Sequence, residues 1–197
     1  MILKGLPDAF YIMEETVLFI DAGYLSYISK YFGKGMPLKY KIERFAINLA
    51  KEKNLIVKEI YYYTAPPFQN PNPSEEENQR KRNYDKFIEK LKSSKPQIII
   101  REGRCQKIDN SFQQKGVDTL MTMDLLRVPN KMNIKNIIII ITADTDFVPI
   151  IKDIKQDGIN PILAYFTDKK RKSSFSLSNH LWKACKIKIL IKKEHFL

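Results

Sequence analysis

The sequence KNIIIIITAD at residues 135–144 contains an unbroken run of isoleucines that ends three residues before Asp144. A short apolar run without polar alternation is typical of a strand covered on both faces, as at the centre of a parallel sheet. A second aspartate, Asp146, follows after one threonine. The stretch therefore predicts a buried central strand whose C-terminal end carries two carboxylates.

Strand and helix patterns alternate along the rest of the chain. Apolar or β-branched runs predict strands at residues 16–21, 55–65, 97–103, 159–166 and 186–191. Apolar residues at helical spacing predict helices at residues 42–53, 75–92, 115–127, 147–156 and 177–184, with a polar connector before residue 115. This alternation predicts an α/β fold with a mainly parallel central sheet and right-handed crossovers.

The chain length favours one domain. With 197 residues, 44% of them hydrophobic, the chain can bury a sizeable core without splitting in two. We expect a leader at residues 1–15 and a single domain at residues 16–197. Its core spans residues 16–166, and residues 167–197 form a basic C-terminal extension.

The net charge points to a polyanionic partner. A formal charge of +12 would attract nucleic acid, although solubility in a lysine-rich proteome is the plainer explanation. No apolar stretch is long enough to span a membrane, and the acidic N-terminus does not resemble a signal peptide, so we expect a cytoplasmic protein without a membrane partner. Cys105 and Cys185 lack the spacing of a disulfide framework or a zinc site.

Four aspartates are expected to meet at one edge of the sheet. Asp21 ends the first strand, Asp144 and Asp146 follow the isoleucine strand, and Asp118 lies in the first turn of the helix opened by KGVD. Carboxyl ends of parallel strands share one edge, where ligands collect. Asp124 lies further along that helix, and we expect it to support the four rather than join them. Each acid also has a plainer explanation: Asp144 as a helix cap, Asp21 as a turn residue, Asp118 as a first-turn acid.

Such a cluster requires a cation. Two carboxylates about 4 Å apart repel by roughly 4 kcal/mol at an effective dielectric constant near 20. Oxygen ligands without cysteine or histidine suit Mg2+ or Mn2+. A cation held there would acidify a water molecule and stabilise the oxyanions of phosphodiester hydrolysis.

Basic residues beside these acids are candidates for contact with a nucleic-acid backbone. Lys115 is the first residue of KGVD, and Thr142 lies two residues before Asp144; both could contact phosphate or metal-bound water. The basic run that follows the strand at 159–166 consists of Lys169, Lys170, Arg171 and Lys172. A solvated loop explains this run equally well. The single tryptophan, Trp182, is expected in the core.

Three segments resemble a known family. IDAGYL (20–25), KGVD (115–118) with Asp124 beyond it, and TADTDFVPIIKDIKQDGINPILAYF (142–166) are similar to the NYN domain, specifically its LabA-like or DUF88 branch within the PIN-like nuclease superfamily. The resemblance implies a PIN-like three-layer sandwich and a divalent-metal-dependent ribonuclease. It implies metal-ligand roles for Asp21, Asp118, Asp144 and Asp146, with Asp124 as an additional family position.

The chain departs from the family pattern in two places. Thr142 and Ala143 replace the usual Ser-Gly, and Tyr24 stands where many members have asparagine, which bears on metal or substrate placement near Asp21. The leading hypothesis is an endoribonuclease that acts on single-stranded or structured RNA. The alternatives are an RNA-binding adaptor with weak or no activity, and a metal-dependent phosphatase or Toprim-like enzyme. A homodimer is also open.

Overall fold

A six-stranded parallel sheet forms the centre of the computed structural model, which describes residues 13–109, 111–141, 145–167 and 178–197. The strand order is β3-β2-β1-β6-β7-β8, and every neighbouring pair is parallel. The strands are β1 (Glu14–Asp21), β2 (Leu55–Thr64), β3 (Gln97–Glu102), β6 (Asn136–Ile140), β7 (Asn160–Tyr165) and β8 (Ile187–Leu190). This confirms the predicted α/β fold with a mainly parallel sheet.

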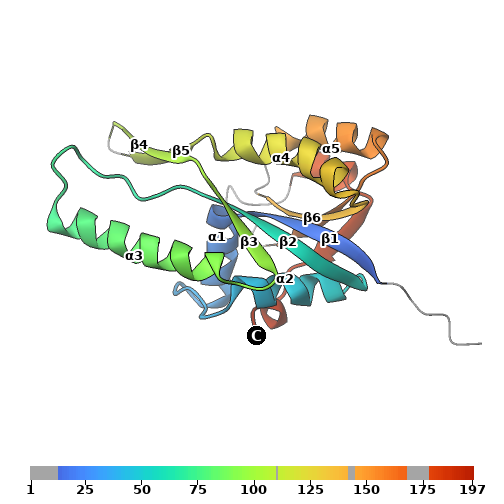
Figure 1. Cartoon of the computed structure of the whole chain (residues 1–197), viewed down its shortest axis with the longest axis horizontal. Coiled ribbons are helices and arrows are strands. Elements are labelled where there is room, and N and C mark those ends of the chain that lie inside the picture. Colours follow the sequence, from blue (N-terminus) through green and yellow to red (C-terminus); the bar gives the residue numbers. More distant parts are fainter. Residues whose placement is uncertain (1–12, 110, 142–144, 168–177) are drawn as a thin grey trace, which may run out of the picture.

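Strand β6 lies at the centre of the sheet between β1 and β7 (Figure 1). Every residue of β6 is buried, and Ile137 to Ile140 have no exposed surface. The isoleucines alternate between two hydrophobic clusters, one on each face. Burial on both faces explains why the strand is uniformly apolar instead of alternating.

Helices cover both faces of the sheet, giving three layers (Figure 1). One face carries α1 (Ala22–Phe32), α2 (Ile42–Lys51), α3 (Glu75–Lys92) and the 3-10 helix η1 (Lys193–Phe196). The other carries α4 (Val117–Met132), α5 (Phe147–Gln156) and α6 (Asn179–Ala184). The reciprocal Ser74–Glu77 capping box starts α3.

Three elements differ from the sequence-based expectation. Helix α1 follows β1 with no intervening loop, and β1 itself begins at Glu14, inside the expected leader. The polar connector forms an antiparallel hairpin of β4 (Arg104–Ile108) and β5 (Ser111–Lys115). All of β5 is exposed, so the hairpin has no buried face that an apolar pattern could reveal.

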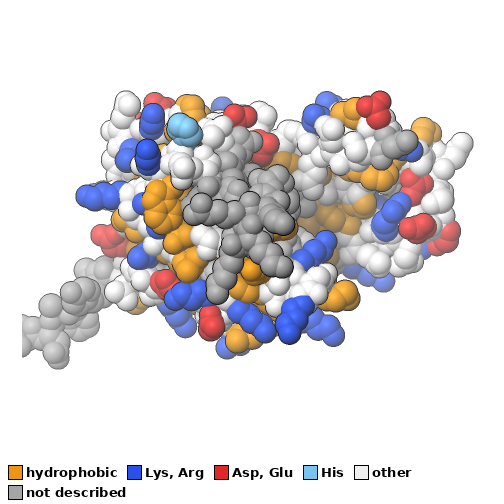
Figure 2. All heavy atoms as spheres, turned by 180° about the vertical axis from the view of Figure 1, so that it is seen from behind, with side chains coloured by type: hydrophobic (Ala, Val, Ile, Leu, Met, Phe, Trp, Pro, Cys, Tyr) orange, Lys and Arg blue, Asp and Glu red, His pale blue; other side chains and the backbone are white. Residues whose placement is uncertain are grey.

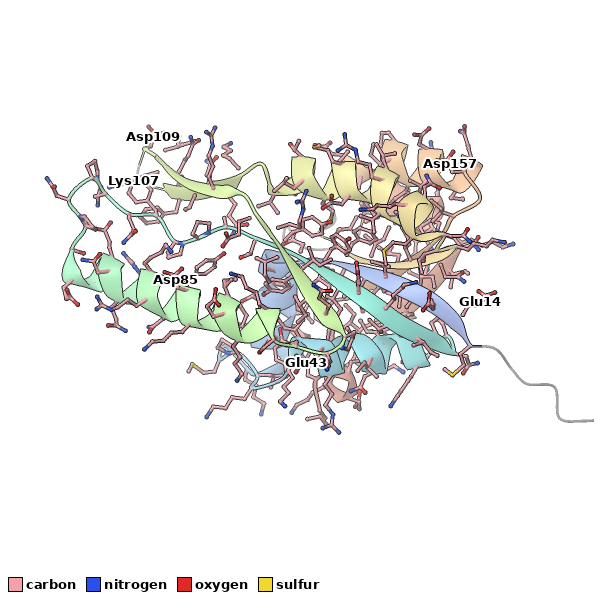
Figure 3. All side chains as sticks on the ribbon, viewed as in Figure 1. Glu14, Glu43, Asp85, Lys107, Asp109 and Asp157 are labelled. Carbon is pink, nitrogen blue, oxygen red and sulfur yellow. The ribbon has the colours of Figure 1, made fainter. Side chains whose placement is uncertain are left out.

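The hairpin and α3 extend beyond the sheet on the same side (Figure 1). Lys107 and Asp109 lie at the outer end of the hairpin, whereas Asp157 and Glu14 lie at the opposite end of the molecule (Figure 3). Phe112 of the hairpin contacts Phe68 in the connector before α3, with ring centroids 5.5 Å apart. The molecule therefore has a projecting arm beside a compact sheet.

In the part of the chain that the structure describes, no helix is both long enough and apolar enough to cross a membrane. Cys185 is buried and Cys105 is partly buried, and both are free thiols.

Candidate active site

The sheet order places the ends of β1 and β6 side by side. From β1 the chain adds β2 and β3 in one direction, and it later adds β6, β7 and β8 in the other direction. Open parallel sheets bind ligands at such a reversal, beyond the carboxyl ends of the strands. Ile20 pairs with Ile140, so Asp21 and the segment after β6 leave the sheet at the same level.

Asp21 caps helix α1 as well as ending β1. Its Oδ1 accepts hydrogen bonds from the backbone N–H groups of Gly23 at 2.8 Å and Tyr24 at 3.2 Å. The sequence suggested a turn residue as the plainer explanation; the structure shows a helix N-cap instead. Both bonds use Oδ1, so capping does not require Oδ2, and the cap fixes the carboxylate at the sheet edge.

Asp118 lies close enough to Asp21 for the two carboxylates to repel. Burial raises the pKa of Asp21 most strongly, the two backbone N–H groups lower this pKa, and the charge of Asp118 raises it further. Asp118 is exposed in the first turn of α4, which starts at Gly116 with a left-handed φ of 81°. Asp118 is thus near enough to Asp21 for its charge to act on the Asp21 carboxyl group.

The other two acids belong to the segment between β6 and α5. Asp146 is exposed at the N-cap position of α5, but its side chain does not cap the helix. Asp144 and Thr142 lie outside the described residues. Within the described ranges, no group of three or more His, Cys, Asp or Glu side chains is placed to hold a metal ion. What these ranges show is the Asp21–Asp118 pair, with Asp146 at the start of a neighbouring helix.

Tyr24 points into the core and not into the site. Its side chain is 1% exposed, and its hydroxyl oxygen accepts a hydrogen bond from the backbone N–H of Phe166 at 3.4 Å. Burial raises the pKa of Tyr24 to about 12, so the hydroxyl stays protonated at neutral pH. Many family members carry asparagine at this position. In this chain the Tyr24 side chain instead links α1 to the end of β7.

Asp124 is held by an arginine that the sequence analysis does not single out. Asp124 is 8% exposed, and its carboxylate accepts two hydrogen bonds from Arg101, at 2.7 Å from Nε and 3.1 Å from an outer nitrogen. The Tyr63 hydroxyl donates a third bond at 3.0 Å. Tyr63 pairs with Asp21 on one side and with Arg101 on the other. The charge of Asp124 is therefore paired with that of Arg101.

Among the predicted nucleic-acid contacts, Lys115 is the one that the structure describes. It is exposed at the end of β5 and lines a cavity of about 480 Å³ with residues that include Arg104, Gly116 and Thr119. Lys169, Lys170, Arg171 and Lys172 lie outside the described residues. Basic side chains also gather along the lower margin of the face turned away in Figure 1 (Figure 2).

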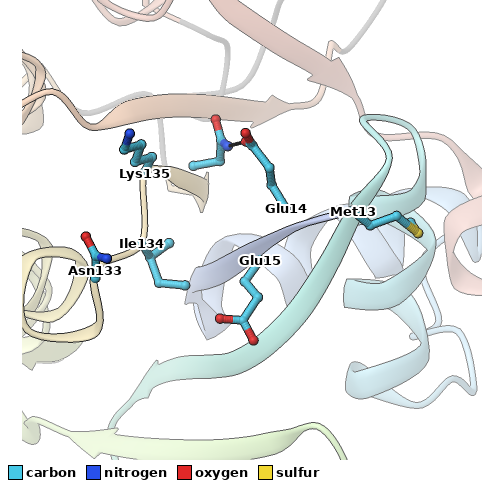
Figure 4. Close-up of a pocket in the computed structure, with 7 residues that line it drawn as sticks. Met13, Glu14, Glu15, Asn133, Ile134 and Lys135 are labelled. Atoms are coloured by element: carbon cyan, nitrogen blue, oxygen red, sulfur yellow. Dashed lines mark hydrogen bonds between the residues drawn. The ribbon is translucent and has the colours of Figure 1, made fainter. Parts of the chain in front are cut away.

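A second cavity lies at the opposite edge of the sheet. It measures about 340 Å³ and is lined by Glu14, Glu15 and Lys135 together with Met13, Asn133, Ile134 and Asn136 (Figure 4). These residues lie at the N-terminal ends of β1 and β6, away from Asp21. This cavity is therefore not part of the candidate site.

The family model of the NYN domain matches residues 15–186. No curated protein matches the chain. Among solved structures, a protein of unknown function from Vibrio parahaemolyticus RIMD 2210633 is similar, with 13% sequence identity and a TM-score of 0.58. The match covers 94% of this chain and 97% of that one. At this level of identity the likeness supports the fold alone.

Proposed function

Because the chain belongs to the NYN domain family, we propose that it is a divalent-metal-dependent endoribonuclease of the PIN-like superfamily. The observation that carries the proposal is the repelling Asp21–Asp118 pair at the reversal of the sheet. Burying one carboxylate beside another is costly unless a cation joins them.

The residues at this edge fit a hard cation. Asp21 and Asp118 would hold it together with Asp144 and Asp146, and carboxylate oxygens suit Mg2+ or Mn2+. When bound, the ion supplies positive charge and makes a water molecule a better nucleophile toward phosphorus. The ligands are held in place by the α1 cap, the first turn of α4 and the start of α5.

The same edge favours a phosphodiester substrate. Helix α1 begins where β1 ends, α5 is the next helix after β6, and α4 begins near Asp21, so their positive N-termini favour a negatively charged substrate at the site. The net charge of +12 draws the RNA backbone in, with Lys115 and the basic run at 169–172 as the proposed contacts. The candidate site lies at an open edge of the sheet, so an RNA strand could continue past it in both directions. We therefore propose endonucleolytic cleavage.

An RNA-binding adaptor is the second candidate. The buried Tyr24 favours it, because the family's side-chain amide is missing from the site. An adaptor would keep the basic surface and the fold but would not need the cation for binding.

Cleavage of labelled single-stranded and hairpin RNA decides between the two candidates. Wild type should cut in Mn2+ or Mg2+ and stop in EDTA. Asp21→Asn and Asp144→Asn should each lower the rate about a hundredfold or more, because several kcal/mol of charge stabilisation depend on the cation. Asp153→Asn, an exposed acid further along α5, is the control with the same charge change. Equal cleavage by all four proteins rejects this site, and binding without cleavage supports the adaptor.

A further inference from the structure

Trp182, the single tryptophan of the chain, is on the surface and not in the core where we expected it. It lies on α6 and is 37% exposed, whereas Leu181 and Ala184 on the same short helix are buried against the sheet. These two side chains already attach α6 to the fold. The indole is therefore not required for docking and presents an aromatic surface to solvent.

The neighbours of Trp182 make it a supported platform. The ring of Tyr165 meets it edge-on, with centroids 4.9 Å apart and an interplanar angle of 88°. The Nζ of Lys188 lies 4.4 Å from the centre of a Trp182 ring, on the adjacent strand β8. The Tyr165 ring thus supports the indole from its edge, and the Lys188 ammonium lies over one of the indole rings.

This platform lies at the same sheet edge as Asp21. Ile20 pairs with Ile140, and Ile139 pairs with Leu163 in β7. Ile140 is therefore level with Ala164, and one step further along each strand Asp21 and Tyr165 lie at the same level. Since β6 is the strand between them, and neighbouring strands are about 4.8 Å apart, the two columns are separated by roughly 10 Å. A single nucleic-acid strand can reach both within a few nucleotides.

The surroundings of the platform are basic. Between residues 178 and 193 the sequence contains lysines but no aspartate or glutamate. Lys183 and Lys186 are exposed close to Trp182 in sequence, and Lys188 adds a third charge. A polyanion with a flat apolar group complements this surface, and unpaired RNA has both features.

A base can displace the lysine from the ring. An exposed cation–π contact strengthens an interaction by about 2–5-fold, whereas stacking of a base on an aromatic side chain contributes about 5–150-fold. The displaced Lys188 ammonium can then contact a phosphate. Stacking needs the flat face of a base, which a duplex keeps covered by its neighbours.

We propose that Trp182, supported by Tyr165 and Lys188, is the stacking site for an unpaired base of the RNA that enters the Asp21 site. This inference rests on the proposed function, because the strand is its substrate. It gives the protein a preference for single-stranded RNA and a fixed offset between the stacked base and the cleaved bond.

Fluorescence of the single tryptophan tests the proposal directly. The full chain is titrated in EDTA, so that cleavage does not interfere, with an unstructured RNA oligonucleotide, an abasic strand of equal length and charge, and a blunt RNA duplex. The base-containing strand should quench Trp182, while the abasic strand and the duplex should leave its emission nearly unchanged. Equal quenching by the abasic strand overturns the stacking assignment.

Anisotropy of labelled RNA separates this inference from the proposed function. Trp182→Leu should weaken single-strand binding about 5–150-fold with little effect on the abasic strand, and Trp182→Phe should restore most of the loss. Lys183→Gln, a neighbouring charge change, should weaken both strands equally. RNA that binds without quenching rejects only the platform, while RNA that does not bind at low salt rejects both proposals. If circular dichroism shows that Trp182→Leu is unfolded, the stacking proposal is tested by the Trp182→Phe variant and by the quenching of the wild-type protein.

Discussion

The carboxyl group of Asp21 is subject to opposing effects on its charge. It caps α1 through two backbone N–H groups, yet burial and Asp118 oppose its negative charge. The folded state therefore binds the Asp21 proton more tightly than the unfolded state does. In the metal-free protein, ionised Asp21 lowers the free energy of unfolding as pH rises from the ordinary pKa of 3.8 through the raised one.

Asp21→Asn should consequently stabilise the metal-free protein at neutral pH. Asparagine caps a helix as well as aspartate does, so the substitution removes the charge and keeps the cap. Asp21→Ala removes both and should be about 1 kcal/mol less stable than Asp21→Asn. Thermal unfolding in EDTA measures the order. The advantage of Asp21→Asn should vanish below pH 3.8, and an advantage that persists there would contradict the charge explanation.

Arg101 should be more important for stability than an ordinary surface arginine. Arg101→Gln leaves the carboxylate of Asp124 buried without its charge partner and should cost about 2 kcal/mol, below the range for a fully buried pair because Arg101 is partly exposed. Tyr63→Phe, which removes one hydrogen bond to the same carboxylate, should cost about 1 kcal/mol. Urea unfolding measures both. An Arg101→Gln protein as stable as wild type would show that the pair contributes nothing.

Some of these residues could be predicted from the sequence, and others could not. Asp21 and Asp118 could be found because each lies at a recognisable boundary, a strand end and a helix start. The Arg101–Asp124 pair could not, because it joins positions that belong to different elements and only the fold brings them together. Tyr24 was noticed as a departure, but its inward direction depends on Phe166 at the end of β7.

Among the elements, the start of α4 is the one that positions Asp118. Gly116 has φ of 81° with open space where a Cβ would lie, so Gly116→Ala should cost about 1 kcal/mol through backbone strain alone. The strain is two residues from Asp118 and should also weaken Mn2+ binding. Gly158→Ala is the matched control, with φ of 80° and open space at the far end of α5. Calorimetry with Mn2+ should show a loss for the first variant only; equal losses would contradict the proposed role of α4.

Most elements with a buried apolar face could be predicted, whereas the exposed hairpin could not. The isoleucine run of β6 and the apolar spacing of α2 and α5 report burial directly. The β4–β5 hairpin is largely exposed, so its pairing leaves no hydrophobic pattern. Helix α1 begins immediately after β1. It has Gly23 in its first turn, and a glycine at that position is equally typical of a loop.

At the scale of the whole molecule, the positive charge should make RNA binding strongly dependent on salt. For single strands the slope of log K against log salt changes by about 0.7 for each phosphate contact. Replacing Lys169, Lys170, Arg171 and Lys172 by glutamine should therefore reduce the slope by up to about 3. The control replaces four lysines that lie toward the N-terminal ends of the strands and changes the net charge equally: Lys51, Lys53, Lys131 and Lys135. Equal slope changes in both variants would assign the effect to net charge alone.

The order of the strands is the whole-molecule property on which the site depends. Alternating strands and helices predict a parallel sheet, but the same alternation is compatible with several strand orders. The order 3-2-1-6-7-8 creates the reversal between β1 and β6 and so brings Asp21 next to the segment that carries Asp144 and Asp146.

A crystal soaked in millimolar Mn2+ tests most directly whether this reversal is a cation site. The account predicts an anomalous peak bounded by Asp21, Asp118, Asp144 and Asp146, and predicts its loss in Asp21→Asn crystals soaked in the same way. A Mn2+ peak elsewhere in the molecule with none among these four carboxylates would contradict it.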